Sequence, residues 1–76
     1  MEFNDFLKNF ADQFEDIDVN TLKAETEFKS IEGWSSLVAL SVIAMVDEEY
    51  DVTLKGDDIK KSTTIKDLYE IVKSRA

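Results

Sequence analysis

The sequence contains no cysteine, no histidine and no proline, and only two of its 76 residues are glycine. Without cysteine, the chain can form no disulfide, zinc–thiolate site or thiol nucleophile. Without histidine, it lacks the commonest general base and the commonest metal ligand. The two glycines, Gly33 and Gly56, are too far apart to form a glycine-rich phosphate loop. These absences leave the chain few ways to act as a catalyst.

Basic residues are also scarce, and the formal net charge is −8. Residues 1–54 hold 13 acids and 3 bases, which gives −10, whereas residues 55–76 hold 4 acids and 6 bases, which gives +2. An acidic field repels nucleic acid and anionic lipid and attracts basic protein surfaces, although solubility alone would also explain it. The apolar run at 37–46 is much shorter than the roughly 20 residues that span a bilayer. We therefore expect no nucleic-acid partner and no stable membrane insertion.

The length and apolar content predict one small domain over residues 1–76. An apolar content of 43% is enough for a single core and argues against disorder. No cluster of lysine or arginine precedes an apolar run near the N-terminus, so we expect no signal peptide. The lack of cysteine fits a reducing compartment, and we expect a cytoplasmic, monomeric protein.

The first half of the chain predicts one amphipathic helix and a long connection. Residues 2–15 have a stripe at helical spacing, which consists of Phe3, Phe6, Leu7, Phe10 and Phe14. Residues 16–34 are an unusually long connection for so small a domain, and such loops are often functional. Four of its apolar residues should anchor it to the core: Leu22, Phe28, Ile31 and Trp34. We expect a helical turn near Thr26–Ile31 and a positive φ angle at Gly33.

Residues 36–50 predict a second helix that has two apolar arcs. Either Ser35 or Ser36 could cap it. At 100° per residue, the arc expected to face the first helix consists of Ala39, Val42, Ile43, Val46 and Tyr50. Leu37, Leu40 and Ala44 fall on a separate arc that so small a chain can hardly bury completely. This second arc is a candidate partner surface.

The remaining segments predict an all-α fold. Residues 51–54 should be extended with Val52 and Leu54 inward, residues 57–61 should form a short helical turn, and residues 64–74 a last helix. Thr63 or Thr64 should cap that helix, with Thr64 and Asp67 resembling a capping box. Its predicted buried stripe consists of Ile65, Leu68, Tyr69, Ile71 and Val72. We therefore expect a small four-helix bundle of three main helices and one short one, with the long loop between the first two.

The motifs disfavour both a catalytic serine nucleophile and a calcium-binding loop. The pattern Gly33-x-Ser35-x-Leu37 lacks the second glycine of a nucleophile elbow, and no strand precedes it. The alternating acids from Asp47 resemble the start of a calcium loop, but Val52 stands where glycine is required and Asp58 where glutamate is required. We therefore expect neither catalytic activity nor a metal site.

The serine pair at the start of the second helix remains as a candidate site. Free N–H groups and the positive end of the helix dipole favour an anion there, so a phosphodiester on a serine would be well placed. The residues alone still favour the plainer interpretation, in which both serines only cap the helix.

Over nearly its whole length, the sequence resembles the acyl carrier protein family. The resemblance rests on Gly33-Trp34-Ser35-Ser36-Leu37, on the helix end Asp47-Glu48-Glu49-Tyr50-Asp51-Val52, and on Ser-Thr-Thr-Ile at 62–65. The family's motif is Asp-Ser-Leu, and its serine maps to Ser36 because Leu37 follows. The resemblance implies a four-helix bundle with a phosphopantetheine group attached covalently to Ser36.

The resemblance also implies partners and a role. A phosphopantetheinyl transferase would attach the arm, which would carry acyl groups as thioesters between enzymes of fatty acid, polyketide or related lipid biosynthesis. Acyl-transferring and chain-elongating enzymes would bind through the second helix, at Leu37, Val38, Leu40, Ala44, Asp47 and Glu48. An aminoacyl or peptidyl carrier of a specialised pathway is an alternative role, and an unmodified interaction module is another.

Two positions depart from the family pattern. Ser35 replaces the motif aspartate, which helps engage the basic surface of the transferase, and Ser35 is therefore a minor rival site. Val38 and Ser41 are uncharged where the family usually has acids. The partner surface should accordingly depend more on apolar contact and less on charge.

Overall fold

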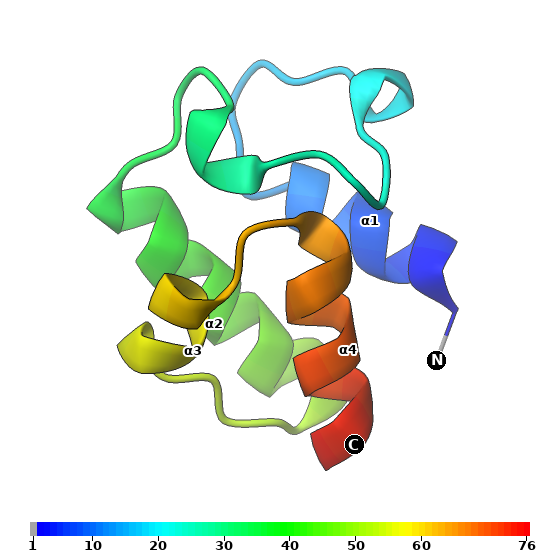
Figure 1. Ribbon diagram of the computed structural model, residues 1–76, viewed down its shortest axis with the longest axis vertical. Coiled ribbons are helices and arrows are strands. Elements are labelled where there is room, and N and C mark those ends of the chain that lie inside the picture. Colours follow the sequence, from blue (N-terminus) through cyan, green and yellow to red (C-terminus); the bar gives the residue numbers. More distant parts are fainter. Residues whose placement is uncertain (1) are drawn as a thin grey trace.

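The computed structural model describes residues 2–76, in which helices are joined by loops. Within that range the α-helices are α1 (Phe3–Ala11), α2 (Ser36–Tyr50), α3 (Gly56–Lys61) and α4 (Ile65–Arg75). Two short 3-10 helices, η1 (Val19–Thr21) and η2 (Phe28–Ser30), lie in the connection between α1 and α2. Figure 1 shows this connection arching over one end of the molecule, away from the C-terminus. The expected all-α fold with three main helices and one short helix is confirmed.

The first helix is shorter than the sequence predicts, because α1 ends at Ala11 and not at residue 15. Beyond it, the N–H groups of Gln13 and Phe14 donate to carbonyl oxygens three residues back, at 3.1 and 3.0 Å. This tighter turn redirects the chain and still buries Phe14. The expected stripe is therefore buried at Phe6, Leu7, Phe10 and Phe14, whereas Phe3 is half-buried.

The long connection is attached to the core by aromatic contacts and to α4 by hydrogen bonds. Phe28 is fully buried, and the centroid of its ring lies 6.0 Å from the ring centroid of Phe10. The N–H groups of Ile65 and Lys66, at the start of α4, donate to loop carbonyls at 3.1 and 3.0 Å. Leu22 is also buried as expected, while Ile31 and Trp34 are half-buried. The predicted turn near Thr26–Ile31 is confirmed as η2.

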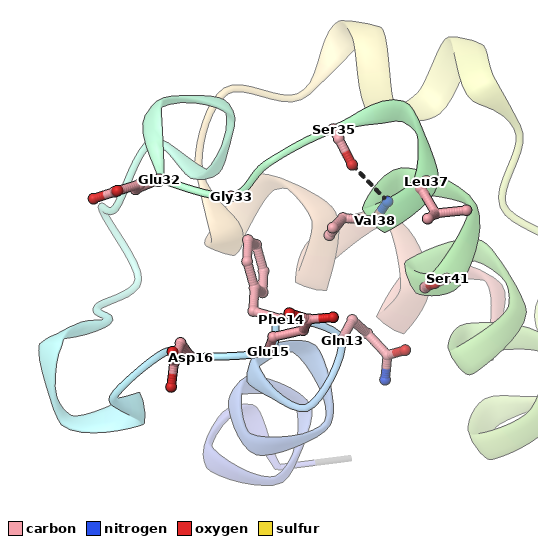
Figure 2. Close-up of a pocket in the computed structure, with 10 residues that line it drawn as sticks. All are labelled: Gln13, Phe14, Glu15, Asp16, Glu32, Gly33, Ser35, Leu37, Val38 and Ser41. Atoms are coloured by element: carbon pink, nitrogen blue, oxygen red, sulfur yellow. Dashed lines mark hydrogen bonds between the residues drawn. The ribbon is translucent and has the colours of Figure 1, made fainter.

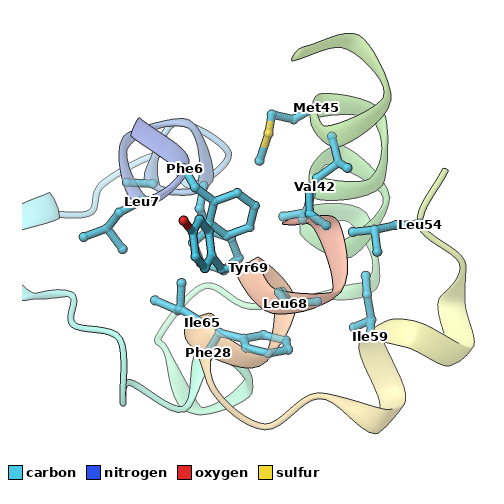
Figure 3. Packing of buried hydrophobic residues seen from close by; sticks show 14 of the residues in the cluster. Phe6, Leu7, Phe28, Val42, Met45, Leu54, Ile59, Ile65, Leu68 and Tyr69 are labelled. Carbon is cyan, nitrogen blue, oxygen red and sulfur yellow. The ribbon is translucent and has the colours of Figure 1, made fainter. Parts of the chain in front are cut away.

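The core face of α2 is rotated from the expected one. Val42 and Val46 are buried as predicted, and Met45, which was not predicted, is buried as well. Figure 3 shows Val42 and Met45 on the side of α2 that faces Phe6. Ala39, Ile43 and Tyr50 are only half-buried, because a helix of 15 residues in so small a domain contacts the core along a narrow stripe.

The C-terminal half follows the sequence closely. Val52 and Leu54 are buried, and Ile65, Leu68, Tyr69 and Val72 of α4 join them, while Ile71 is half-buried. Thr64 is the N-cap of α4, which moves the start of the helix from residue 64 to Ile65. Its hydroxyl accepts the N–H of Asp67 at 3.2 Å, and the Asp67 carboxylate accepts the N–H of Thr64 at 3.0 Å. The predicted capping box is confirmed.

A buried carboxylate, that of Asp58 in α3, connects α3 to the last turn of α4. Asp58 is 4% exposed and accepts two hydrogen bonds from the guanidinium group of Arg75, at 2.8 and 2.9 Å. The same carboxylate accepts the backbone N–H of Lys55 at 2.9 Å, and Arg75 also donates to the carbonyl oxygen of Thr53 at 3.1 Å. These bonds fix the short helix α3, whose six residues could not hold it in place alone.

Across residues 2–76, the helices are all too short or too polar to cross a membrane.

Candidate functional site

The start of α2 is set by Gly33 and Ser35. Gly33 has a φ angle of 96°, a left-handed conformation that favours glycine, and this confirms the expected positive φ. Ser35 is the N-cap, and its Oγ accepts the N–H of Val38 at 3.2 Å (Figure 2). The sequence allowed either serine as the cap, and the structure assigns this role to Ser35.

Ser36 has no such structural role. It is the first residue of α2 and its side chain is exposed. Among residues 2–76 no group forms a hydrogen bond with its hydroxyl, and the N–H groups of Ser36 and Leu37 have no acceptor. These free N–H groups and the helix dipole favour negative charge at this position. A phosphodiester on Ser36 would therefore fit the helix start without displacing the Ser35 cap.

An apolar face consisting of Leu37, Leu40 and Ala44 runs along α2 from this point. Leu37 is 74% exposed and Leu40 61% exposed, although both are large apolar side chains. Ala44 is exposed one turn further on, and Asp47 and Glu48 follow at the acidic end of the helix. The structure thus leaves uncovered the arc that the sequence identified as a candidate partner surface.

Val38 differs from the other residues of the predicted partner surface. It is half-buried and packs against the core, so it presents less apolar area to a partner than Leu37 or Leu40. Its backbone N–H is the group that donates to the Ser35 cap (Figure 2).

An open cleft of ≈ 640 Å³ adjoins the start of α2. One wall is the turn at 13–16 that follows α1, and the other is formed by residues that include Ser35, Leu37 and Val38. In Figure 2, Phe14 and Val38 point into the space between the walls. Sequence patterns could not reveal this α1–α2 cleft, because they extended the first helix through residue 15 and so missed the turn that forms one wall.

The acidic residues of the described range, 2–76, do not gather into a metal site. Within the part of the chain that the structure describes, no group of three or more His, Cys, Asp or Glu side chains could hold a metal ion. Asp58, which stands at the last ligand position of the calcium-loop pattern, is paired with Arg75.

Comparison with known families gives a match that spans most of the chain. A family model described as a phosphopantetheine attachment site matches residues 5–72, from α1 to the later turns of α4. The chain belongs to the phosphopantetheine-binding family. Membership implies a covalently attached phosphopantetheine group, for which the exposed serine at the helix start is chemically suited. Carrier domains of the phosphopantetheine-binding family interact with a phosphopantetheinyl transferase and with biosynthetic enzymes.

Proposed function

We propose that this protein is an acyl carrier whose phosphopantetheine group is attached to Ser36. The observation that carries the proposal is the contrast between the two serines. The Ser35 hydroxyl is used as the helix cap, whereas the Ser36 hydroxyl is exposed and makes no hydrogen bond within residues 2–76. Only Ser36 can therefore be modified without loss of a cap, which is typically worth about 1 kcal/mol.

In this function the chain presents a substrate and breaks no bond itself. The attached arm supplies a thiol that holds an acyl group as a thioester, which fits a chain that has no cysteine. The free N–H groups at the start of α2 stabilise the negative phosphodiester, and the bundle keeps the attachment point exposed. Tethering raises the effective concentration of the acyl group for each enzyme that docks.

We propose that the partner enzymes dock on α2. The apolar face supplies the contact area, with Val38 at its edge, and the acids Asp47 and Glu48 favour a basic partner surface. A phosphopantetheinyl transferase and acyl-transferring or chain-elongating enzymes of fatty acid, polyketide or related lipid biosynthesis are the partners that fit this role. We also propose that the protein acts as a monomer in the cytoplasm and has no catalytic activity.

A second candidate function is an unmodified interaction module that uses the same apolar face. The observation that favours it is Ser35, which replaces the aspartate that helps to engage the transferase. An aminoacyl or peptidyl cargo is a further alternative to a fatty acyl cargo.

Intact-mass measurement distinguishes these functions. The protein is incubated with coenzyme A and several phosphopantetheinyl transferases, alongside a Ser36→Ala variant. We expect one phosphopantetheine mass increment on the wild type and none on the variant. No increment with any transferase would favour the unmodified module.

A further inference from the structure

We propose that the phosphopantetheine arm, once attached to Ser36, folds back into the α1–α2 cleft instead of extending into solvent. This inference rests on the proposed function, because it requires the arm at Ser36. It assigns a resting place for the arm to a cleft that has residues 13–16, which lie 20 to 23 positions before the attachment point, as one wall.

The position of the cleft supports this proposal. Ser35 and Leu37, the two neighbours of Ser36, both line it, so an arm leaving Ser36 starts at its edge. The volume of ≈ 640 Å³ lies within the range of about 300–1,000 Å³ that is typical of small-molecule sites. Two other hollows are smaller, at ≈ 280 and ≈ 290 Å³, and neither includes a neighbour of Ser36.

The walls of the cleft match the chemistry of the arm. Val38, which is half-buried, offers apolar surface to the geminal methyl groups and methylenes of the arm, and the 8% of Phe14 that is exposed lies beside it (Figure 2). Gln13 donates its amide N–H to the carbonyl oxygen of Asn9 at 3.0 Å, which leaves its own side-chain oxygen available as an acceptor. The Glu15 carboxylate points toward the cleft in Figure 2 and has no hydrogen-bond or ion-pair partner among the described residues. Both acceptors can take the two amide N–H groups of the arm.

Because the arm is tethered to the protein, a weak interaction is enough to hold it in the cleft for much of the time. A short flexible linker gives an effective concentration on the order of mM, so an intrinsic dissociation constant of about 1 mM would keep the arm docked about half of the time. Docking of this strength does not prevent release to an enzyme. Leu37 belongs both to the cleft wall and to the apolar face, so an enzyme that covers this face also reaches the mouth of the cleft.

The proposal is tested by comparing amide NMR spectra of the apo and holo proteins, with loading verified by intact mass. We expect the arm to shift the amide signals of residues 13–16 as well as those beside Ser36. We also expect nuclear Overhauser contacts from the geminal methyl groups of the arm to Phe14 and Val38. Shifts confined to the residues beside Ser36, with no such contacts, would overturn the proposal. A wild-type protein that never gains the arm would instead overturn the proposed function.

A matched pair of variants separates docking from the covalent change itself. Ser41 lines the cleft, and Ala44 lies one turn further along α2, outside it. For each variant the amide spectra of its own apo and holo forms are compared. In Ser41→Phe, whose ring would fill the cleft, we expect the apo-to-holo shifts at residues 13–16 to disappear. In holo Ala44→Phe we expect them to persist. The same response in both variants would contradict docking in the cleft.

Discussion

Both terminal nitrogens of Arg75 donate hydrogen bonds to the buried carboxylate of Asp58, at 2.8 and 2.9 Å. The pair links the short helix α3 to the last turn of α4, and Arg75 lies beyond residues 5–72, the part of the chain that matches the family. A bidentate pair of this kind combines charge with fixed geometry. The C-terminal turn is thereby part of the fold.

The first prediction is that removing this guanidinium group destabilises the protein. In Arg75→Ala the carboxylate of Asp58 stays buried, loses both hydrogen bonds from the guanidinium group and keeps as a charged partner only the more distant Lys61 ammonium at 3.8 Å, which is unfavourable. We expect the urea midpoint of Arg75→Ala to fall clearly, and that of Arg75→Lys to fall less. Lys66→Ala, which removes an exposed charge from the same helix, should leave the midpoint almost unchanged. Equal midpoints for Arg75→Ala and Lys66→Ala would show that the pair has no structural role.

The second prediction concerns the pH dependence of stability. Hydrogen bonds from Arg75 and from the Lys55 backbone lower the pKa of Asp58 from 3.8 to about 2. A pKa that is lower in the folded state gives stability that is present above the unfolded value and is lost as the pH falls towards the folded value. We therefore expect the stability difference between wild type and Asp58→Asn to be constant near neutral pH and to shrink between about pH 4 and pH 2. A difference that does not change over this interval would mean that Asp58 titrates normally.

The third prediction separates core residues from surface residues on α2. Val46 is fully buried, so Val46→Ala should cost about 2 kcal/mol of unfolding free energy. Leu40 is 61% exposed, so Leu40→Ala should change the unfolding free energy by no more than about 0.5 kcal/mol. In a transferase-binding assay the order should reverse, with Leu40→Ala the more damaging variant. A large loss of stability in Leu40→Ala would show that the apolar face belongs to the core. Ile43, which the sequence placed in the core, is half-buried, so a substitution there would distinguish stability from partner binding less clearly.

The fourth prediction addresses the unusual residue before the attachment point. Aspartate is as good an N-cap as serine, so Ser35→Asp should leave the stability nearly unchanged. An added charge that meets a basic transferase contributes up to about 1 kcal/mol in water, or about fivefold in rate at low ionic strength. We expect wild-type modification to slow only weakly as salt is added, and Ser35→Asp to start faster and slow more steeply. Identical salt profiles for the two proteins would rule out a steering role at this position.

Much of this fold could be predicted from the sequence, because periodicity and caps are local signals. The bounds of α2, the capping box of Thr64 and the positive φ of Gly33 all follow from a few neighbouring residues. The end of α1 could not be predicted, since the burial of Phe14 is satisfied equally well by a helix and by the tighter turn that the chain adopts. The α1–α2 cleft depends on that turn and was missed with it.

The functional site could be predicted from the sequence only in part, for a similar reason. The motif and the exposed apolar face can be found by their spacing, but the division of roles between Ser35 and Ser36 depends on one hydrogen bond to Val38. The pair of Asp58 and Arg75 joins residues 17 positions apart, and no periodic pattern relates them. Contacts of this kind require the packed chain.

The most direct test of the central claim is to locate the arm on the serine pair. The wild-type protein is modified by a phosphopantetheinyl transferase, digested, and analysed by tandem mass spectrometry of the peptide that contains Ser35 and Ser36. We predict that the phosphopantetheine group is found on Ser36 alone and that Ser35→Ala is still modified. An arm found on Ser35, or a Ser36→Ala variant that is modified as fully as the wild type, would contradict the assignment.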